Sequence, residues 1–207
     1  MSQKGCENLF TSLARYSRSA RYFQGMSKIA IILCIVFLLP ALCIAAEISA
    51  TVLKISDGDT IWVKTDNGQK LKLRLLGIDT PEKFSGRKLE RDASKCGVRP
   101  GKVKNLGQLA THHAKELVHR GERVRIIIRG RGYYGRVLAF IILPDGTNFN
   151  FRMVEDGYAC VYTWHGKKSR ELSWKEFLTL KALLIKAKKE KAGLWGINPS
   201  LMNCLCR

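Results

Sequence analysis

The sequence is poor in acidic residues and lacks the motifs of a zinc site. Seventeen Asp and Glu stand against 36 Lys and Arg among 207 residues, which gives a formal net charge of +19. There is no Cys-x-x-Cys pair and no histidine cluster at ligand spacing, so a zinc-binding domain is not expected. Internal repeats and low-complexity segments are also absent, which argues against a repeat protein. A single domain with appendages fits this length.

The positive charge favours a polyanionic partner, with nucleic acid first and an anionic membrane surface second. A solvated basic surface without a specific partner is the alternative. Residues 1–46 hold only five basic residues and one acidic residue, so most of the excess belongs to the rest of the chain.

An apolar run of 18 residues extends from Ile29 to Ala46 and follows Lys28. A basic flank, an apolar core and a small-residue end predict an export signal that is cleaved near Ala46. An uncleaved membrane anchor is the alternative, because about 18 residues is close to the minimum for a span. In both cases we expect the domain to be exported, either periplasmic or secreted, and anchored if the segment is retained. Met26 offers an alternative start for the same signal.

Four cysteines follow this leader, at positions Cys96, Cys160, Cys204 and Cys206. An even number in an exported domain is compatible with disulfides, and four cysteines allow three pairings. The sequence does not choose among these pairings.

Alternating apolar residues and turn signals predict short strands over residues 47–55, 60–65, 70–75, 123–129, 137–143 and 158–163. Helices are expected over residues 106–120, 149–156 and 173–191, and a long basic surface loop over residues 83–104. The pattern predicts an α+β, mainly β fold, namely a five-stranded OB-fold barrel with about three helices. The expected domain covers residues 47–198, and a Cys-containing tail covers residues 199–207.

Two acidic clusters and an arginine define the candidate site. Asp57 and Asp59 precede an expected hairpin, Asp79 and Glu82 follow it, and Arg74 lies on the returning strand. Carboxylates and an arginine in this order suit a hard cation held against a phosphate. Asp57 is interpreted as support for the turn.

Basic and apolar residues alternate strictly along the returning strand, residues 70–75. This period places Leu71, Leu73 and Leu75 toward the core, and it places Lys72 and Arg74 on an outward-facing basic stripe.

Four motifs occur in a recognisable order: DGDT, RLLGIDTPE, YGR and KAKKEKAGLW. In these motifs the chain resembles the thermonuclease (staphylococcal nuclease-like) family over residues 48–197. The resemblance implies an OB-fold nuclease that is exported, depends on calcium, hydrolyses DNA and RNA as a monomer, and leaves 3′-phosphate ends. The metal ligands implied are Asp59, Asp79 and the carbonyl of Thr80, the general base is Glu82, and the catalytic arginines are Arg74 and Arg136.

The resemblance also implies a substrate-packing tyrosine at Tyr134. Tyr133, Tyr162 and Lys72 are further candidates for binding substrate, because aromatic rings stack on bases and lysine pairs with phosphate. The chain departs from the family in having a longer and more basic segment after Glu82, which would either extend the contact with nucleic acid or cover the barrel.

Two other functions are compatible with this sequence. One is a nucleic-acid-binding OB-fold module that kept the barrel without the chemistry, and the other is a membrane-attached basic protein that binds anionic lipid. Retention of the acidic residues and both arginines favours the nuclease.

Overall fold

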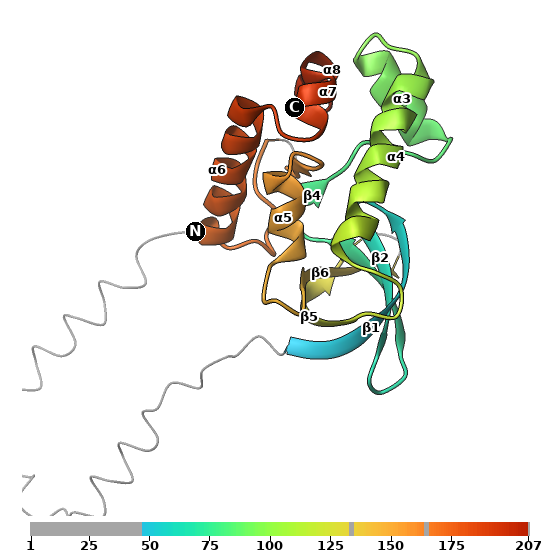
Figure 1. Cartoon of the computed structure of the whole chain (residues 1–207), viewed down its shortest axis with the longest axis vertical. Coiled ribbons are helices and arrows are strands. Elements are labelled where there is room, and N and C mark those ends of the chain that lie inside the picture. Colours follow the sequence, from blue (N-terminus) through green and yellow to red (C-terminus); the bar gives the residue numbers. More distant parts are fainter. Residues whose placement is uncertain (1–46, 133–134, 164–165, 207) are drawn as a thin grey trace, which may run out of the picture. The chain divides into compact units, whose positions relative to one another are not determined.

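Five strands close into a barrel in the computed structural model, which describes residues 47–132, 135–163 and 166–206 (Figure 1). The barrel strands are β1 (Glu47–Asp57), β2 (Thr60–Thr65), β3 (Lys70–Leu75), β5 (Arg123–Arg131) and β6 (Val137–Ile142). Their order around the barrel is β1-β2-β3-β6-β5. The predicted five-stranded OB-fold barrel is therefore confirmed.

The barrel mixes antiparallel and parallel pairs. The three strands β1, β2 and β3 form an antiparallel meander, and β5 pairs antiparallel with both β1 and β6. The pair β3–β6 is parallel, with Leu73 opposite Val137. Parallel neighbours require a long crossover, and here helix α4 (Pro100–Leu117) and strand β5 lie between them in sequence.

The prediction that the apolar residues of β3 face the core is confirmed. Leu71, Leu73 and Leu75 are buried inside the barrel, as the period of two requires. The bounds of β2 and β3 are those expected from the sequence.

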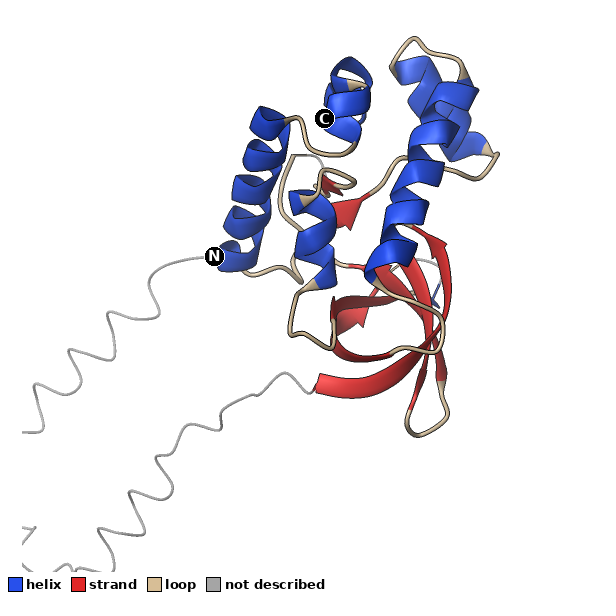
Figure 2. Cartoon of the chain, in the orientation of Figure 1, coloured by secondary structure: helices blue, strands red, loops and turns tan. Residues whose placement is uncertain are grey.

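The described residues contain six helices instead of the expected three or so (Figure 2). Besides α4 they are α3 (Arg87–Lys95), α5 (Phe149–Glu155), α6 (Trp174–Glu190), α7 (Leu194–Ile197) and α8 (Pro199–Leu205). Helix α6 lies within the range 173–191 expected for a helix, and a capping box at Ser173 begins it, with Glu176 accepting a hydrogen bond from the Ser173 backbone.

The prediction of a long loop over residues 83–104 was wrong. This segment holds α3 and the first turn of α4, which begins with Pro100 at a position where a missing N–H costs nothing. Leu89 and Ala93 bury the inner face of α3. Two apolar residues in a nine-residue helix make a weak periodic signal, so the basic residues and glycines of this segment favoured the prediction of a loop.

Two short strands lie outside the barrel. β4 (Ile78–Asp79) pairs with β7 (Cys160–Val161), so the expected strand over residues 158–163 is only a two-residue ribbon. The ribbon places Asp79 opposite Cys160.

The C-terminal tail is structured. Helix α8 carries Cys204 and ends before Cys206, and disulfides join Cys96 to Cys204 and Cys160 to Cys206. The tail is thus bound both to the end of α3 and to β7. Within the described ranges, no helix has the length and apolarity needed to cross a bilayer. The predicted export signal, residues 29–46, falls outside the described residues.

Candidate active site

The hairpin of β2 and β3 positions the centre of the site. Asp59 immediately precedes β2, and Thr60 pairs with Arg74 across the hairpin. The N–H of Leu75 donates to the carbonyl of Asp59 at 2.9 Å, which closes the ladder at this end. Main-chain pairing therefore brings the Asp59 and Arg74 side chains together.

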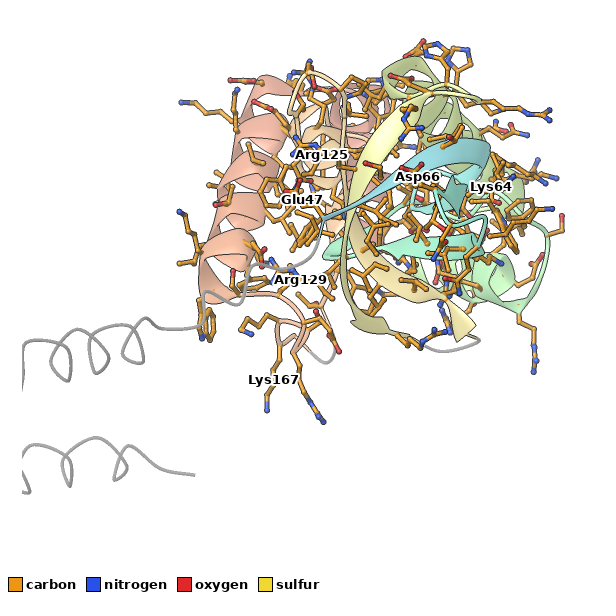
Figure 3. All side chains as sticks on the ribbon, turned by 90° about the horizontal axis from the view of Figure 1, so that it is seen from below. Glu47, Lys64, Asp66, Arg125, Arg129 and Lys167 are labelled. Carbon is orange, nitrogen blue, oxygen red and sulfur yellow. A yellow bond between two sulfur atoms is a disulfide. The ribbon has the colours of Figure 1, made fainter. Side chains whose placement is uncertain are left out.

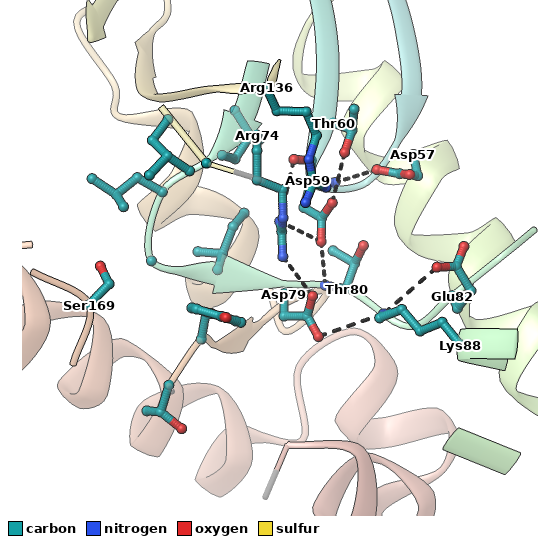
Figure 4. Close-up of a pocket in the computed structure, with 18 of the residues that line it drawn as sticks. Asp57, Asp59, Thr60, Arg74, Asp79, Thr80, Glu82, Lys88, Arg136 and Ser169 are labelled. Atoms are coloured by element: carbon teal, nitrogen blue, oxygen red, sulfur yellow. Dashed lines mark hydrogen bonds and ion pairs between the residues drawn. The ribbon is translucent and has the colours of Figure 1, made fainter. Parts of the chain in front are cut away.

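Arg74 bridges two carboxylates. Its Nη1 lies 2.7 Å from Oδ2 of Asp59, and its Nη2 lies 2.7 Å from Oδ1 of Asp79 (Figure 4). The arginine side chain is only 13% exposed, so the predicted outward-facing position was wrong for this residue. The period of two gave the correct side of the strand, but on that side the Arg74 guanidinium contacts the carboxylates of Asp59 and Asp79 instead of extending into solvent.

The turn at Asp57–Asp59 packs directly against Thr80. A Cβ atom added to Gly58 would lie 2.7 Å from the Thr80 side chain, so only glycine allows this approach. The N–H of Thr80 donates to Oδ2 of Asp59 at 3.0 Å, and the N–H of Asp59 donates to Oδ1 of Asp57 at 3.2 Å. Asp57 thus supports the turn, as its sequence position indicated.

In the ion pair of Asp59 with Arg74, each charge stabilises the ionised form of the other. Burial alone would raise the pKa of Asp59, but the charge of Arg74 and the Thr80 N–H outweigh it and hold that pKa below its usual range. Burial would likewise lower the pKa of Arg74, and the charges of Asp59 and Asp79 raise it instead. Both groups are therefore ionised across the physiological range.

The pKa values of Asp79 and Asp57 are raised, in contrast to that of Asp59. Burial raises the pKa of Asp79 despite the opposing charges of Arg74 and Lys88. Burial also raises the pKa of Asp57 to about 7, and the neighbouring charge of Asp59 acts in the same direction. Negative charge in this pocket exceeds what Arg74 neutralises, so an added cation would favour the ionised carboxylates.

Glu82 is placed by the packing of α4. Its Oε1 accepts a hydrogen bond from the N–H of Phe84 at 3.0 Å. A Cβ atom added to Gly107 of α4 would lie 2.6–2.7 Å from backbone atoms of residues 81–83. The helix therefore lies directly on the backbone that carries Glu82.

Lys88 is a site residue that the sequence reading missed. Its Nζ lies 3.8 Å from both Asp79 Oδ2 and Glu82 Oε2, and 3.7 Å from Asp92 Oδ2. Burial would lower the pKa of Lys88, but these carboxylates, with Asp79 foremost, raise it. Recognition of α3, through Leu89 and its i+4 partner Ala93, would have pointed to this position.

These groups line one cleft of about 1330 Å³, which also takes in Arg136 and Tyr162. Arg136 enters from the segment before β6 (Figure 4). The guanidinium of Arg74 lies 5.9 Å from the Tyr162 ring centroid. The structure therefore assembles the predicted acidic residues, both arginines and Tyr162 in a single cleft.

Of the other substrate-binding candidates, the structure describes only Lys72. Lys72 is exposed, lies 5.7 Å from the Trp62 ring centroid, and does not line the cleft. Tyr133 and Tyr134 lie outside the described residues.

The donor set suits a hard divalent cation. Asp59, Asp79 and the Thr80 carbonyl offer only oxygen ligands, and both carboxylates face the same guanidinium. Among the described residues, no three His, Cys, Asp or Glu side chains converge on one point. The site thus provides a carboxylate pair, which leaves the remaining ligand positions to backbone, water and substrate.

A closed OB-type barrel with acidic residues and arginines in one cleft is an arrangement that suits the binding of a phosphate ester. A family model described as staphylococcal nuclease homologue matches residues 72–196. The chain belongs to this family, which supports a nuclease function.

Three relatives illustrate the similarity. An uncharacterized endonuclease of Escherichia coli is 32% identical over 161 residues, covering 78% of this chain and 84% of the relative. Endonuclease YhcR of Bacillus subtilis is 28% identical over 158 residues, which are 75% of this chain. The match covers only 12% of the length of YhcR. Thermonuclease of Staphylococcus intermedius is 32% identical over 54% of this chain and 58% of its own length.

Proposed function

We propose that this protein is a calcium-dependent nuclease that hydrolyses phosphodiester bonds in both DNA and RNA. The observation that carries the proposal is the Arg74 bridge between Asp59 and Asp79 in a cleft that also holds Glu82 and Arg136. A phosphodiester is an anion, so a nucleophile is repelled until its charge is neutralised, and this cleft supplies the neutralising groups.

Asp59, Asp79 and the Thr80 carbonyl would hold the calcium ion. A bound Ca²⁺ supplies positive charge that polarises the phosphoryl oxygen and orients water. Asp57, Asp59 and Asp79 place three carboxyl groups in the cleft, two of them in contact with the Arg74 guanidinium, which supports a divalent cation at this position.

The two arginines bind the phosphate group of the substrate. Arg74 and Arg136 can each present two N–H donors to phosphate oxygens, and they stay charged throughout the reaction. Removing one donor to a developing oxyanion typically reduces the rate about 10²-fold to 10³-fold.

Glu82 is the proton acceptor. Its carboxylate is held by the Phe84 N–H at one oxygen and lies near Lys88 at the other, so its orientation is defined before substrate binds. From there it would remove the proton of the attacking water. By resemblance to the thermonuclease family, the 5′ oxygen leaves and the product keeps a 3′-phosphate.

We also propose that the protein acts as an exported monomer. The apolar run at residues 29–46 and the two disulfides both fit an oxidising compartment. All the proposed site residues come from one chain. N-terminal sequencing of protein recovered outside the cytoplasm would test the cleavage near Ala46.

Digestion of single-stranded DNA and of RNA, each with Ca²⁺ and with chelator, tests the central proposal. We expect cleavage only with Ca²⁺, and a decrease of at least about 10²-fold for Glu82→Gln and for Arg74→Ala. Products should resist extension by a polymerase until a phosphatase removes the 3′-phosphate. Binding without turnover, unaffected by Glu82→Gln, would instead identify the non-catalytic module.

A further inference from the structure

Helix α3 presents a basic face to the cleft. Lys88, Arg91 and Lys95 all line it, together with the Asp79 and Glu82 side chains. Their spacing of three and four residues places them on one side of a helix, opposite the buried Leu89 and Ala93.

This face leads outward from the reaction centre. The Lys88 side chain is 39% exposed and sits beside Asp79 and Glu82, whereas the Arg91 side chain is 71% exposed. Seven residues separate Lys88 from Lys95, or about 10 Å along a helix axis.

The opposite rim of the cleft is basic too. Lys167 and Arg170 line it from the segment before α6, and both are exposed. Figure 3 shows the Lys167 side chain extending from that segment. A polyanionic strand would therefore meet basic residues on both sides of the cleft, which Asp92 and Glu171 also line.

The arginines of β5 differ from those of α3. Arg123 pairs with Asp66, Arg125 with Glu47, and Arg129 with Glu176, so acidic partners neutralise these three arginines. Figure 3 shows Arg125 beside Glu47. On α3, Arg91 has only the adjacent Asp92, at 3.5 Å, and within the described residues Lys95 has no ion pair. The charges of Arg91 and Lys95 are therefore available to a ligand in the cleft.

We propose that Lys88, Arg91 and Lys95 bind consecutive phosphates of a single nucleic-acid strand, next to the bond that is cleaved. This inference rests on the proposed nuclease function and deepens it, because it assigns a polymer subsite to a helix that follows Glu82. It requires that affinity depend on strand length, since a dinucleotide cannot reach Arg91 and Lys95.

Binding of a fluorescent single-stranded DNA 12-mer to the Glu82→Gln protein, measured with Ca²⁺ over a series of salt concentrations, tests the subsite. Adding Arg91→Gln and Lys95→Gln should make the slope of log K against log salt shallower by about 1.4, since each phosphate contact contributes about 0.7. The matched control is Arg87→Gln with Lys102→Gln, two exposed residues outside the cleft lining with the same charge change. Its slope should equal that of the parent.

Cleavage assays separate the two proposals. In the otherwise unaltered protein, Arg91→Gln with Lys95→Gln should lower the ratio of kcat/KM for the 12-mer to kcat/KM for a dinucleotide by about tenfold or more. An unchanged slope and ratio, with cleavage intact in the parent, would overturn the α3 subsite and leave the nuclease standing. A parent that cuts neither substrate, yet shows the slope change, would overturn the nuclease and retain the strand contact.

Discussion

On the barrel side of the cleft, Asp59 immediately precedes β2 and Arg74 lies on β3, and backbone hydrogen bonds between these segments set the separation of the two side chains. On the helical side, Lys88 belongs to α3, whose C-terminal end is bound to α8 by the Cys96–Cys204 disulfide. The first side follows from sheet pairing and is independent of redox state. The second depends on a covalent link and helix packing, so the two sides should respond differently to the same perturbations.

The largest effect is expected on the barrel side. Arg74→Ala leaves the buried carboxylate of Asp59 without its ion-pair partner and leaves Asp79 with Lys88 alone, so the free energy of unfolding should fall by about 4 kcal/mol. Urea denaturation measures this change. Lys72→Ala, an exposed position on the same strand, is the control and should change stability by no more than about 0.5 kcal/mol. Equal losses in both variants would contradict the buried bridge.

The next effect concerns the helical side. Cys96→Ser with Cys204→Ser opens a link between residues 108 positions apart, and we expect a loss of about 3 kcal/mol. Urea denaturation with and without reductant measures it. Reductant should destabilise the parent more than this variant, which has already lost one of its two links. A parent that is insensitive to reductant would contradict the role of the disulfides in holding this side.

A smaller effect is expected where the two sides meet. Gly107→Ala forces a methyl group against the backbone of residues 81–83, which should cost about 1–3 kcal/mol and displace Glu82. Nuclease activity should fall at temperatures where the variant is still folded. Gly101→Ala in the same helix is the matched control, because its added Cβ meets nothing within 4 Å. Similar activity in both variants would contradict the positioning of Glu82 by α4.

The smallest effect is pH-dependent. Burial alone would raise the pKa of Asp156, but hydrogen bonds from His113 at 2.8 Å and Arg152 at 2.9 Å outweigh it and lower that pKa. A lowered pKa stabilises the fold above the usual carboxyl range and loses that contribution as the pH falls. Asp156→Asn should therefore cost about 1 kcal/mol at pH 7 and almost nothing near pH 2. A pH-independent difference in urea denaturation would show a purely structural role.

Local patterns were sufficient for much of the barrel. The period of two in residues 70–75 and the turn at residues 66–68 predicted the hairpin with its bounds, because pleating and turn chemistry act within a few residues. The segment after Glu82 was misread, since basic residues and glycines concealed the short apolar face of α3. Lys88 was missed for the same reason.

What the sequence alone determined was the set of acidic residues and arginines and the strands that carry most of them, since both depend on residues close along the chain. Tertiary structure decided that Arg74 is buried, that Cys96 pairs with Cys204, and that α3 lines the cleft beside Asp79. Each of these depends on contacts between segments far apart in sequence, which form only when β4, α3 and α8 pack against one another. No local periodicity encodes such contacts.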